Sequence, residues 1–352
     1  MAFFNRRIIG AVLAIAVIAA LGFVMYWKQL LERPLPIKDP MVYEVESGLG
    51  ANQVMAQLQA RNVLPEVWPL KIWLKLNPAK ALLKAGEYEI PVGLNAYELL
   101  ALLASGKTVQ YQVTLPEGLN FAEALQLLQR QDKLAVKTTD LTVPQIMQKV
   151  SGKPLNEVPH HEGRFFPDTY QYHKGVSDLQ ILKRAYDKMN RVLEEEWQKA
   201  DKAALPYNSA YEALIMASIV EKETGVPSER SRIAGVFVQR LEKGMRLQTD
   251  PTVIYGLGDR YQGNITRRHL KEKTAYNTYR INGLPPTPIA LPGQDAIHAA
   301  LNPLKEGELY FVARGDGSHK FSRTLEEHNQ AVRHYQIYKR KQNYQSAPDT
   351  QQ

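Results

Sequence analysis

Residues 213–224 read ALIMASIVEKET, and this stretch says more about the fold than any other part of the sequence. Its first eight residues carry no charge and are mostly apolar. A helix formed by them would have apolar side chains on every face, which is typical of a helix that is buried nearly all round. We therefore expect a buried helix here, with the polar residues Glu-Lys-Glu-Thr at its carboxyl end.

Glu221 is the first carboxyl group to leave that apolar segment. Apolar neighbours remove hydration from a carboxyl group, which disfavours its charged form and raises its pKa. A carboxyl group with a raised pKa can donate a proton to a glycosidic oxygen. Glu221 is therefore the candidate general acid. The alternative is that Glu-Lys-Glu-Thr-Gly is only the polar exit of a helix, with Gly225 as its left-handed terminal residue.

Glu223 is the competing carboxylate of the same motif. It follows Glu221 by two positions, so on a helix the two side chains do not face each other. We expect only one of them to act, without a facing carboxylate partner.

Two segments after this helix combine polar and aromatic side chains. Residues 245–255 contain Asp-Pro, which is expected to start a turn, and residues 274–279 read TAYNTY and precede the proline-rich loop 283–293. Their rings, amides and hydroxyls suit a saccharide groove, although a proline-rich connector would have the same composition. The candidate sugar-binding residues here are Gln248, Asp250, Tyr276, Asn277 and Tyr279.

Upstream, residues 161–170 read HEGRFFPDTY and form a predicted loop. Three aromatic residues lie beside two carboxylates there, a composition that suits sugar rings. Glu162 is the candidate ligand in this loop. A buried aromatic corner with capping carboxylates is the alternative.

The N-terminus predicts a membrane anchor. Residues 8–25 read IIGAVLAIAVIAALGFVM without a charge, and with Tyr26 and Trp27 they reach the roughly 20 residues that span a bilayer. A cleaved signal peptide is the alternative, but its apolar region usually has about 7 to 15 residues. We expect a short cytoplasmic tail over residues 1–7, a transmembrane helix over 8–27 and the rest of the chain outside.

Residues 28–40 contain three prolines and predict a stiff spacer. The next region, residues 41–108, shows the order strand, helix, helix, strand between Tyr43 and Ile90, which resembles a glycan-binding LysM module. The alternative is that this small unit is only scaffold.

The predicted fold class is α+β, with a larger mixed α+β catalytic region over residues 109–345 and a disordered tail over 346–352. Asn95 and Asn120 are expected N-caps of helices. Further helices are predicted at about 120–131, 176–199 and 294–301, followed by a β-hairpin within 308–322.

Composition excludes several functions. The formal charge is +8, but no nucleic-acid motif is visible and acidic residues are interspersed with the basic ones. Absence of cysteine rules out disulfides and thiol catalysis. No spacing of the eight histidines suits a metal site, so we expect neither a metal nor a cofactor.

Six ordered segments resemble the MltG/YceG-like family of endolytic murein transglycosylases. The resemblance covers nearly the whole chain, including the anchor and the LysM-like unit. The segments are EGRFFPDTY (162–170), ASIVEKET (217–224), LQTDPTVIYG (247–256), TAYNTY (274–279), GLPPTPIALPG (283–293) and LYFVARGDGSHKFSRT (309–324).

The resemblance implies that Glu221, in the IVEKET motif, is the catalytic acid/base. It further implies a single-pass inner-membrane lyase with its body in the periplasm, which cleaves nascent peptidoglycan strands and so ends their elongation. In this reaction the C6 hydroxyl of muramic acid attacks its own C1 and yields a 1,6-anhydro sugar. Expected partners are the glycan strands, the inner membrane through residues 8–27 and the peptidoglycan synthases.

Two other functions stay open. One is a non-catalytic scaffold that binds glycan through the LysM-like unit and recruits synthases. The other is a muramidase that uses water, with Asp250 as its second carboxylate.

Overall fold

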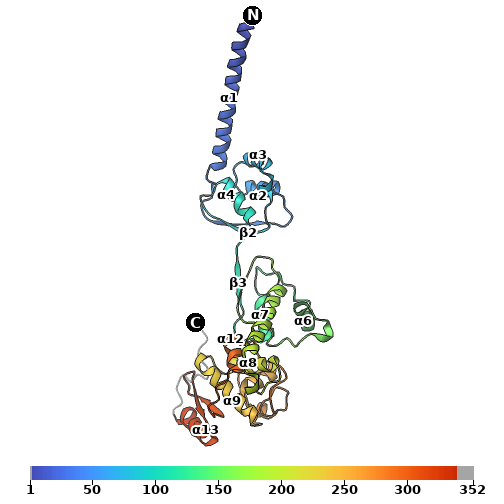
Figure 1. Cartoon of the computed structure of the whole chain (residues 1–352), viewed down its shortest axis with the longest axis vertical. Helices are drawn as coiled ribbons and strands as arrows, with labels where there is room; N and C mark the ends of the chain where they lie inside the picture. Colours follow the sequence, from blue (N-terminus) through green and yellow to red (C-terminus); the bar gives the residue numbers. More distant parts are fainter. Residues whose placement is uncertain (1, 339–352) are drawn as a thin grey trace. The chain divides into compact units, whose positions relative to one another are not determined.

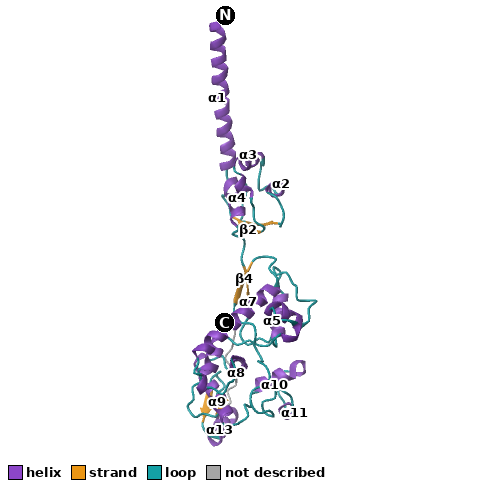
Figure 2. Ribbon diagram, turned by 45° about the vertical axis from the view of Figure 1, so that its right-hand side comes forward, coloured by secondary structure: helices purple, strands orange, loops and turns teal. Residues whose placement is uncertain are grey.

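A computed structural model describes residues 2–338 of the chain. The predicted tail over residues 346–352 lies outside the described residues, as does the end of the predicted region 109–345. The chain divides into an N-terminal unit, Met1–Tyr111 with Gln171–Lys174, and a C-terminal unit, Gln112–Tyr170 with Gly175–Gln352. Helix predominates over strand in both units (Figure 2).

The N-terminal unit begins with α1 (Ala2–Glu32), which extends beyond the predicted span 8–27 at both ends. Its segment Ile8–Glu32 is long and apolar enough to cross a membrane, with a hydropathy of 2.8 and no part of the most apolar window buried. The absence of charge from residue 8 to residue 27 accounts for this composition.

The predicted spacer 28–40 is not free of the folded unit. Leu31 and Leu35 are 1% and 6% exposed and belong to the same hydrophobic core as the first strand and its helices. The backbone N–H of Leu35 donates to the carbonyl of Leu94 at 2.8 Å. The three prolines therefore do not separate α1 from the rest of the unit, because Leu31 before them and Leu35 between two of them are buried in its core.

The order strand, helix, helix, strand that the sequence predicts is confirmed. The elements are β1 (Met41–Val45), α2 (Ala51–Ala60), α3 (Trp68–Leu76) and β2 (Gly86–Ile90). The two strands pair antiparallel, with Tyr43 opposite Tyr88, and both tyrosines are buried. α4 (Ala96–Ser105) follows, and Asn95 caps it as predicted, since its side chain accepts from the N–H of Glu98.

The C-terminal unit contains most of the helices. Those with α geometry are α5 (Phe121–Gln129), α6 (Val143–Ser151), α7 (Asp178–Lys199), α8 (Ala210–Glu223), α9 (Arg230–Glu242), α10 (Asp250–Leu257), α11 (Arg267–Lys271), α12 (Gln294–Leu301) and α13 (Leu325–Val332). The short 3-10 helices of the chain are η1 (Pro78–Ala81), η2 (Leu155–Glu157), η3 (Lys202–Ala204), η4 (Pro227–Glu229) and η5 (Gly258–Arg260), and η6 (Arg333–Tyr338) is a π-helix.

α8 is the buried helix that residues 213–224 predict. Every residue from Ala213 to Val220 is buried, because the helix packs against α12, α9 and α7 (Figure 1). A Cβ at Gly235 of α9 would overlap the backbone carbonyl of Leu304, so a glycine is required where these segments approach. The side chains of α8 that contact solvent are thus confined to its ends.

Short strands complete the fold. β3 (Tyr111–Thr114) pairs with β4 (Thr169–Tyr172) in a two-stranded sheet, and the unit boundary falls within both strands. The predicted hairpin is confirmed as β5 (Tyr310–Ala313) and β6 (His319–Ser322). Asn120 caps α5 as predicted. The expected turn at Asp250 is instead the start of α10, since the fixed φ of Pro251 suits the first turn of a helix.

Candidate active site

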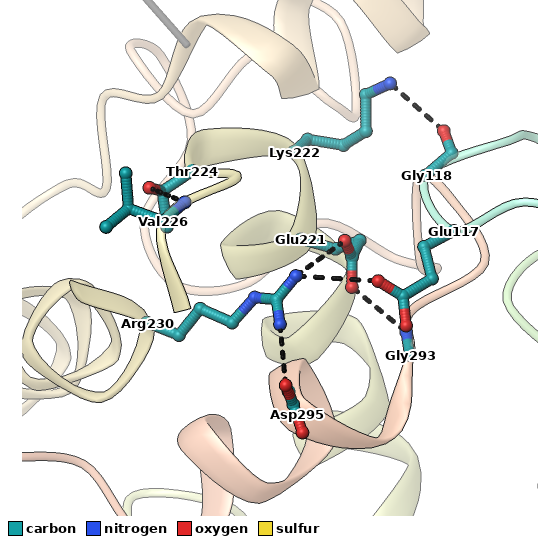
Figure 3. Close-up of polar contacts among 9 residues, drawn as sticks. All are labelled: Glu117, Gly118, Glu221, Lys222, Thr224, Val226, Arg230, Gly293 and Asp295. Carbon is teal, nitrogen blue, oxygen red and sulfur yellow. Dashed lines mark hydrogen bonds and ion pairs between the residues drawn. The ribbon is translucent and has the colours of Figure 1, made fainter. Parts of the chain in front are cut away.

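Glu221 and Glu223 leave the carboxyl end of α8 in different directions. The Glu221 carboxylate lies between α9 and the loop before α12, as Figure 3 shows. The Glu223 carboxylate contacts Thr249, which precedes α10. The prediction that the side chains of Glu221 and Glu223 do not face each other is therefore confirmed.

Glu221 is held by groups of the protein itself. The N–H of Gly293 donates to its Oε2 at 3.0 Å, and Nη2 of Arg230 lies 3.6 Å from its Oε1. Only 6% of its side chain is exposed. Burial raises its pKa and the nearby Glu117 carboxylate adds to this, whereas the Gly293 N–H and the Arg230 and Lys222 cations act to lower it.

Arg230 joins three carboxylates at this place (Figure 3). Besides Glu221, its guanidinium contacts Asp295 at 3.0 Å and Glu117 at 3.5 Å. We call Glu117, Glu221, Arg230, Gly293 and Asp295 the Arg230 junction. It connects the ends of α8, α9 and α12 to the loop before α5, so Glu221 contributes to the packing of the helix ends.

Glu223 lies on the other side, in the wall of a cleft. Its Oε1 accepts a hydrogen bond from the hydroxyl of Thr249, and its side chain is half-buried. Burial raises its pKa to about 7, and the Asp250 carboxylate contributes in the same direction. The Thr249 hydroxyl and the Arg240 cation oppose this rise. At neutral pH a substantial fraction of Glu223 is therefore protonated.

The cleft has a volume of about 800 Å³ and lies within the C-terminal unit. Among the residues that line it are Glu223, Arg240, Gln248, Asp250, Tyr261, Tyr279, Tyr310, His319 and His328. Gln248 and Asp250 are exposed, and the hydroxyl of Tyr279 donates to Oδ1 of Asp250 at 2.7 Å. Rings beside amides and carboxylates can stack on sugars and bond their hydroxyls.

Buried threonines fix the segment that faces Glu223. The hydroxyls of Thr252 and Thr278 lie 2.8 Å apart, and the Thr278 hydroxyl accepts from the N–H of Thr249 at 3.0 Å. Gln248 has a positive φ of 50°, which only a supported backbone holds at a residue other than glycine. Its N–H donates to the carbonyl of Thr278 at 3.2 Å. The threonines thus hold Gln248 and Thr249 in place at the cleft.

Glu162 does not reach the cleft. It is 2% exposed, and its two oxygens accept from the N–H of Phe121 at 3.0 Å and the hydroxyl of Tyr255 at 3.1 Å. Burial raises its pKa to about 7. The buried-corner alternative therefore describes this residue, and its expected role as a sugar ligand does not agree with its position.

Asn277 and Tyr276 also form hydrogen bonds within the protein. Asn277 is 1% exposed, and its Nδ2 donates to the carbonyls of Glu272 at 2.6 Å and His269 at 3.1 Å. The hydroxyl of Tyr276 lies 2.8 Å from that of Thr287. Of the residues predicted to bind sugar, the structure therefore brings Gln248, Asp250 and Tyr279 together in the cleft.

Sequence reasoning missed the position of Glu223. Two glutamates flank one lysine on α8, and the sequence contains no sign of which of them faces residues 248–250.

Comparison with known proteins assigns the family. Residues 43–334 match the YceG-like family. A Bacillus subtilis (strain 168) protein named endolytic murein transglycosylase is 30% identical over 332 residues, which cover 89% of this chain and 90% of that protein. The chain therefore belongs to the YceG-like family.

Two further relatives agree. A Streptococcus pneumoniae serotype 2 protein, also named endolytic murein transglycosylase, is 26% identical over 92% of this chain and 64% of its own length. The chain thus spans just under two thirds of that protein. A solved YceG-like protein from Listeria monocytogenes superposes with a TM-score of 0.53 at 32% identity, covering 84% of this chain and 99% of the other.

Proposed function

We propose that this protein is a lytic transglycosylase that cleaves the glycan strands of peptidoglycan, with Glu223 as its acid/base. Membership of the YceG-like family and relatives named endolytic murein transglycosylase support the reaction class. The observation on which the assignment of the acid rests is that Glu223, with its pKa raised to about 7, lines the cleft.

Glu223 has the properties that the first step needs. Its protonated form donates a proton to the glycosidic oxygen as the bond to C1 of muramic acid breaks. Positive charge then develops at C1 in the oxocarbenium-like transition state.

In the second step the substrate supplies its own nucleophile. The C6 hydroxyl attacks C1 and gives its proton to the Glu223 carboxylate, which restores the acid and leaves a 1,6-anhydro ring. No second carboxylate is needed for activation of water. A hydroxyl tethered to the reacting ring also has a far higher effective concentration than a free nucleophile.

Glu221 remains the alternative acid, as the motif resemblance predicts. Its burial also raises its pKa, but both of its oxygens contact the protein groups of the Arg230 junction. Gln248 and Tyr279 are proposed to bind the sugar, since they line the cleft with Glu223.

The cellular setting is part of the proposal. The apolar helix Ile8–Glu32 supports a single-pass anchor in the inner membrane, with the C-terminal unit in the periplasm near the synthases that make nascent strands. The β1-α2-α3-β2 region is proposed to bind glycan as a LysM-like module, on the basis of its order of elements.

The product tests the reaction. Digestion of purified peptidoglycan in oxygen-18 water should give muropeptides that end in 1,6-anhydro-muramic acid, about 18 Da lighter than reducing ends and without label. Labelled reducing ends as the main product would contradict the transglycosylase proposal.

A muramidase that uses water is the second candidate. It is favoured by one observation, that Asp250 lines the same cleft as Glu223 and raises its pKa. In that mechanism Asp250 would activate water or attack C1, so Asp250→Asn would abolish cleavage and the products would be labelled.

A further inference from the structure

A second hollow lies in the C-terminal unit beside the cleft. It has a volume of about 600 Å³ and is lined by Arg260, Arg267, Arg268, Lys271 and Glu272. We call these residues the basic pocket. Its lining includes four cations and one carboxylate, so it has a strong excess of positive charge.

Most of this charge is not neutralised by the protein. Arg260 pairs with Glu272 at 3.0 Å. Between residues 2 and 338, Arg267, Arg268 and Lys271 make no ion pair, and all three side chains are exposed. Like charges held together without a counter-charge repel one another, and an anionic ligand would relieve that repulsion.

The basic pocket adjoins the cleft along one stretch of chain. Tyr261, Asn264 and Ile265 line the cleft, whereas Arg260 and Arg267 on either side of them line the basic pocket. A ligand whose sugar lies in the cleft can therefore place a substituent in the basic pocket.

Asn277 holds the carboxyl end of the short helix that carries three of these cations. Its buried amide donates to the carbonyls of His269 and Glu272, at the carboxyl end of α11. Since Tyr279 lines the cleft only two residues later, the basic pocket and the cleft share one support. Buried hydrogen bonds thus hold the backbone at the carboxyl end of α11, which carries Arg267, Arg268 and Lys271, beside the segment that leads to Tyr279.

We propose that the basic pocket binds the carboxylates of the acidic peptide stems attached to the muramic acid residues of the glycan strand. This inference rests on the proposed function, because it takes the strand as the ligand of the cleft. Guanidinium groups bind carboxylates in a bidentate way, and three uncompensated cations suit a stem with more than one carboxylate. Stems recur along the strand, so one is available wherever the sugar is bound.

The experiment compares strands that keep their stems with strands from which an amidase has removed them. Binding is measured by fluorescence anisotropy in the full chain with Glu223→Gln, so that the strands stay intact. The triple variant Arg267→Gln, Arg268→Gln, Lys271→Gln removes the uncompensated charge. A control triple removes the same charge from exposed lysines of the same unit, Lys137→Gln, Lys149→Gln and Lys153→Gln.

We expect the chain to bind intact strands more tightly than stripped strands. The ratio of the affinity for intact strands to the affinity for stripped strands should fall about tenfold in the basic-pocket triple, which corresponds to the loss of three exposed ion pairs. The dependence of this ratio on salt concentration should also be lost. The control triple should leave the ratio unchanged.

Three results would overturn the proposal. They are equal affinity of the parent chain for the two kinds of strand, an unchanged ratio in the basic-pocket triple, and competition by inorganic pyrophosphate but not by a free stem peptide. Cleavage is measured separately with the wild-type chain. Absence of cleavage together with a preserved affinity ratio would reject the proposed reaction and keep the basic pocket as a stem-binding site.

Discussion

The two sides of the carboxyl end of α8 place similar groups in very different surroundings. On one side, the Arg230 junction surrounds Glu221 with a guanidinium and a backbone N–H. On the other side, Glu223 has the Thr249 hydroxyl and an open cleft. Burial raises the pKa of both. A raised pKa alone therefore does not identify an acid, and access to a substrate distinguishes the two carboxyls.

The largest expected effect comes from substitution of Glu223. Glu223→Gln keeps size and hydrogen bonding but removes the proton, so strand cleavage should fall about a hundredfold or more. Its melting temperature should be close to that of the wild type. Cleavage is measured by release of soluble muropeptides.

Glu221→Gln is the matched control. It leaves Arg230 and the Gly293 N–H with a weaker acceptor, so it should cost about 1 to 3 kcal/mol of stability and affect cleavage less than Glu223→Gln. Should Glu221→Gln abolish cleavage in a chain that melts normally, while Glu223→Gln remains active, the roles of the two sides would be reversed.

Substitution of Arg230 tests whether the Arg230 junction stabilises the fold. Arg230→Met leaves the buried Glu221 without its cation, so the free energy of unfolding should fall by about 3 kcal/mol. Urea unfolding monitored by circular dichroism measures this loss. Lys243→Met, at an exposed position after α9, is the control and should change stability by less than about 0.5 kcal/mol. An Arg230 variant as stable as the control would show that the junction does not stabilise the helix ends.

Glu162 adds a buried carboxyl that lies outside the cleft. Its pKa of about 7 exceeds the ordinary 4.5, so its contribution to stability is complete below about pH 4.5 and is lost as pH rises through 7. In Glu162→Gln, the decrease in the free energy of unfolding as pH rises should be smaller than in the wild type by about 1 to 3 kcal/mol. Urea unfolding from pH 5 to 8 measures it. A profile that is already flat in the wild type would contradict the raised pKa.

The smallest expected effect concerns Asp250. Its negative charge helps to keep the proton on Glu223, so Asp250→Asn should lower the pKa of Glu223. Since the protonated form is the active acid, the loss of cleavage with rising pH should then begin at a lower pH, by about half a unit. The pH dependence of kcat/KM measures the shift. Complete loss of activity at every pH would instead favour Asp250 as a second catalytic carboxylate.

Local signals in the sequence predicted much of the fold. The apolar residues from Ala213 to Val220 predicted the buried helix, and Asn95 and Asn120 predicted helix starts because an N-cap depends on nearby backbone groups. The β5-β6 hairpin followed from alternation and a glycine-rich turn.

Features that depend on distant segments could not be predicted in this way. The side on which Glu223 meets Thr249 is set by the packing of α8 against other helices. Glu162 and Asn277 have polar side chains suited to sugars, but partners far along the chain or on a neighbouring helix bury them. The sequence shows which groups a side chain can bind, but the tertiary structure determines whether those groups belong to a ligand or to the protein.

The burial of Leu31 and Leu35 has a consequence for the proposed membrane anchor. A flexible tether would let a domain tumble while its anchor stays upright. Here the last turn of α1 is part of the core of the N-terminal unit, and the indole of Trp27 donates to the carbonyl of Pro69 at 3.0 Å. A tilt or rotation of α1 would therefore move the β1-α2-α3-β2 region with it. With α1 as the proposed membrane anchor, bilayer thickness, which influences helix tilt, would also influence the orientation of the β1-α2-α3-β2 region.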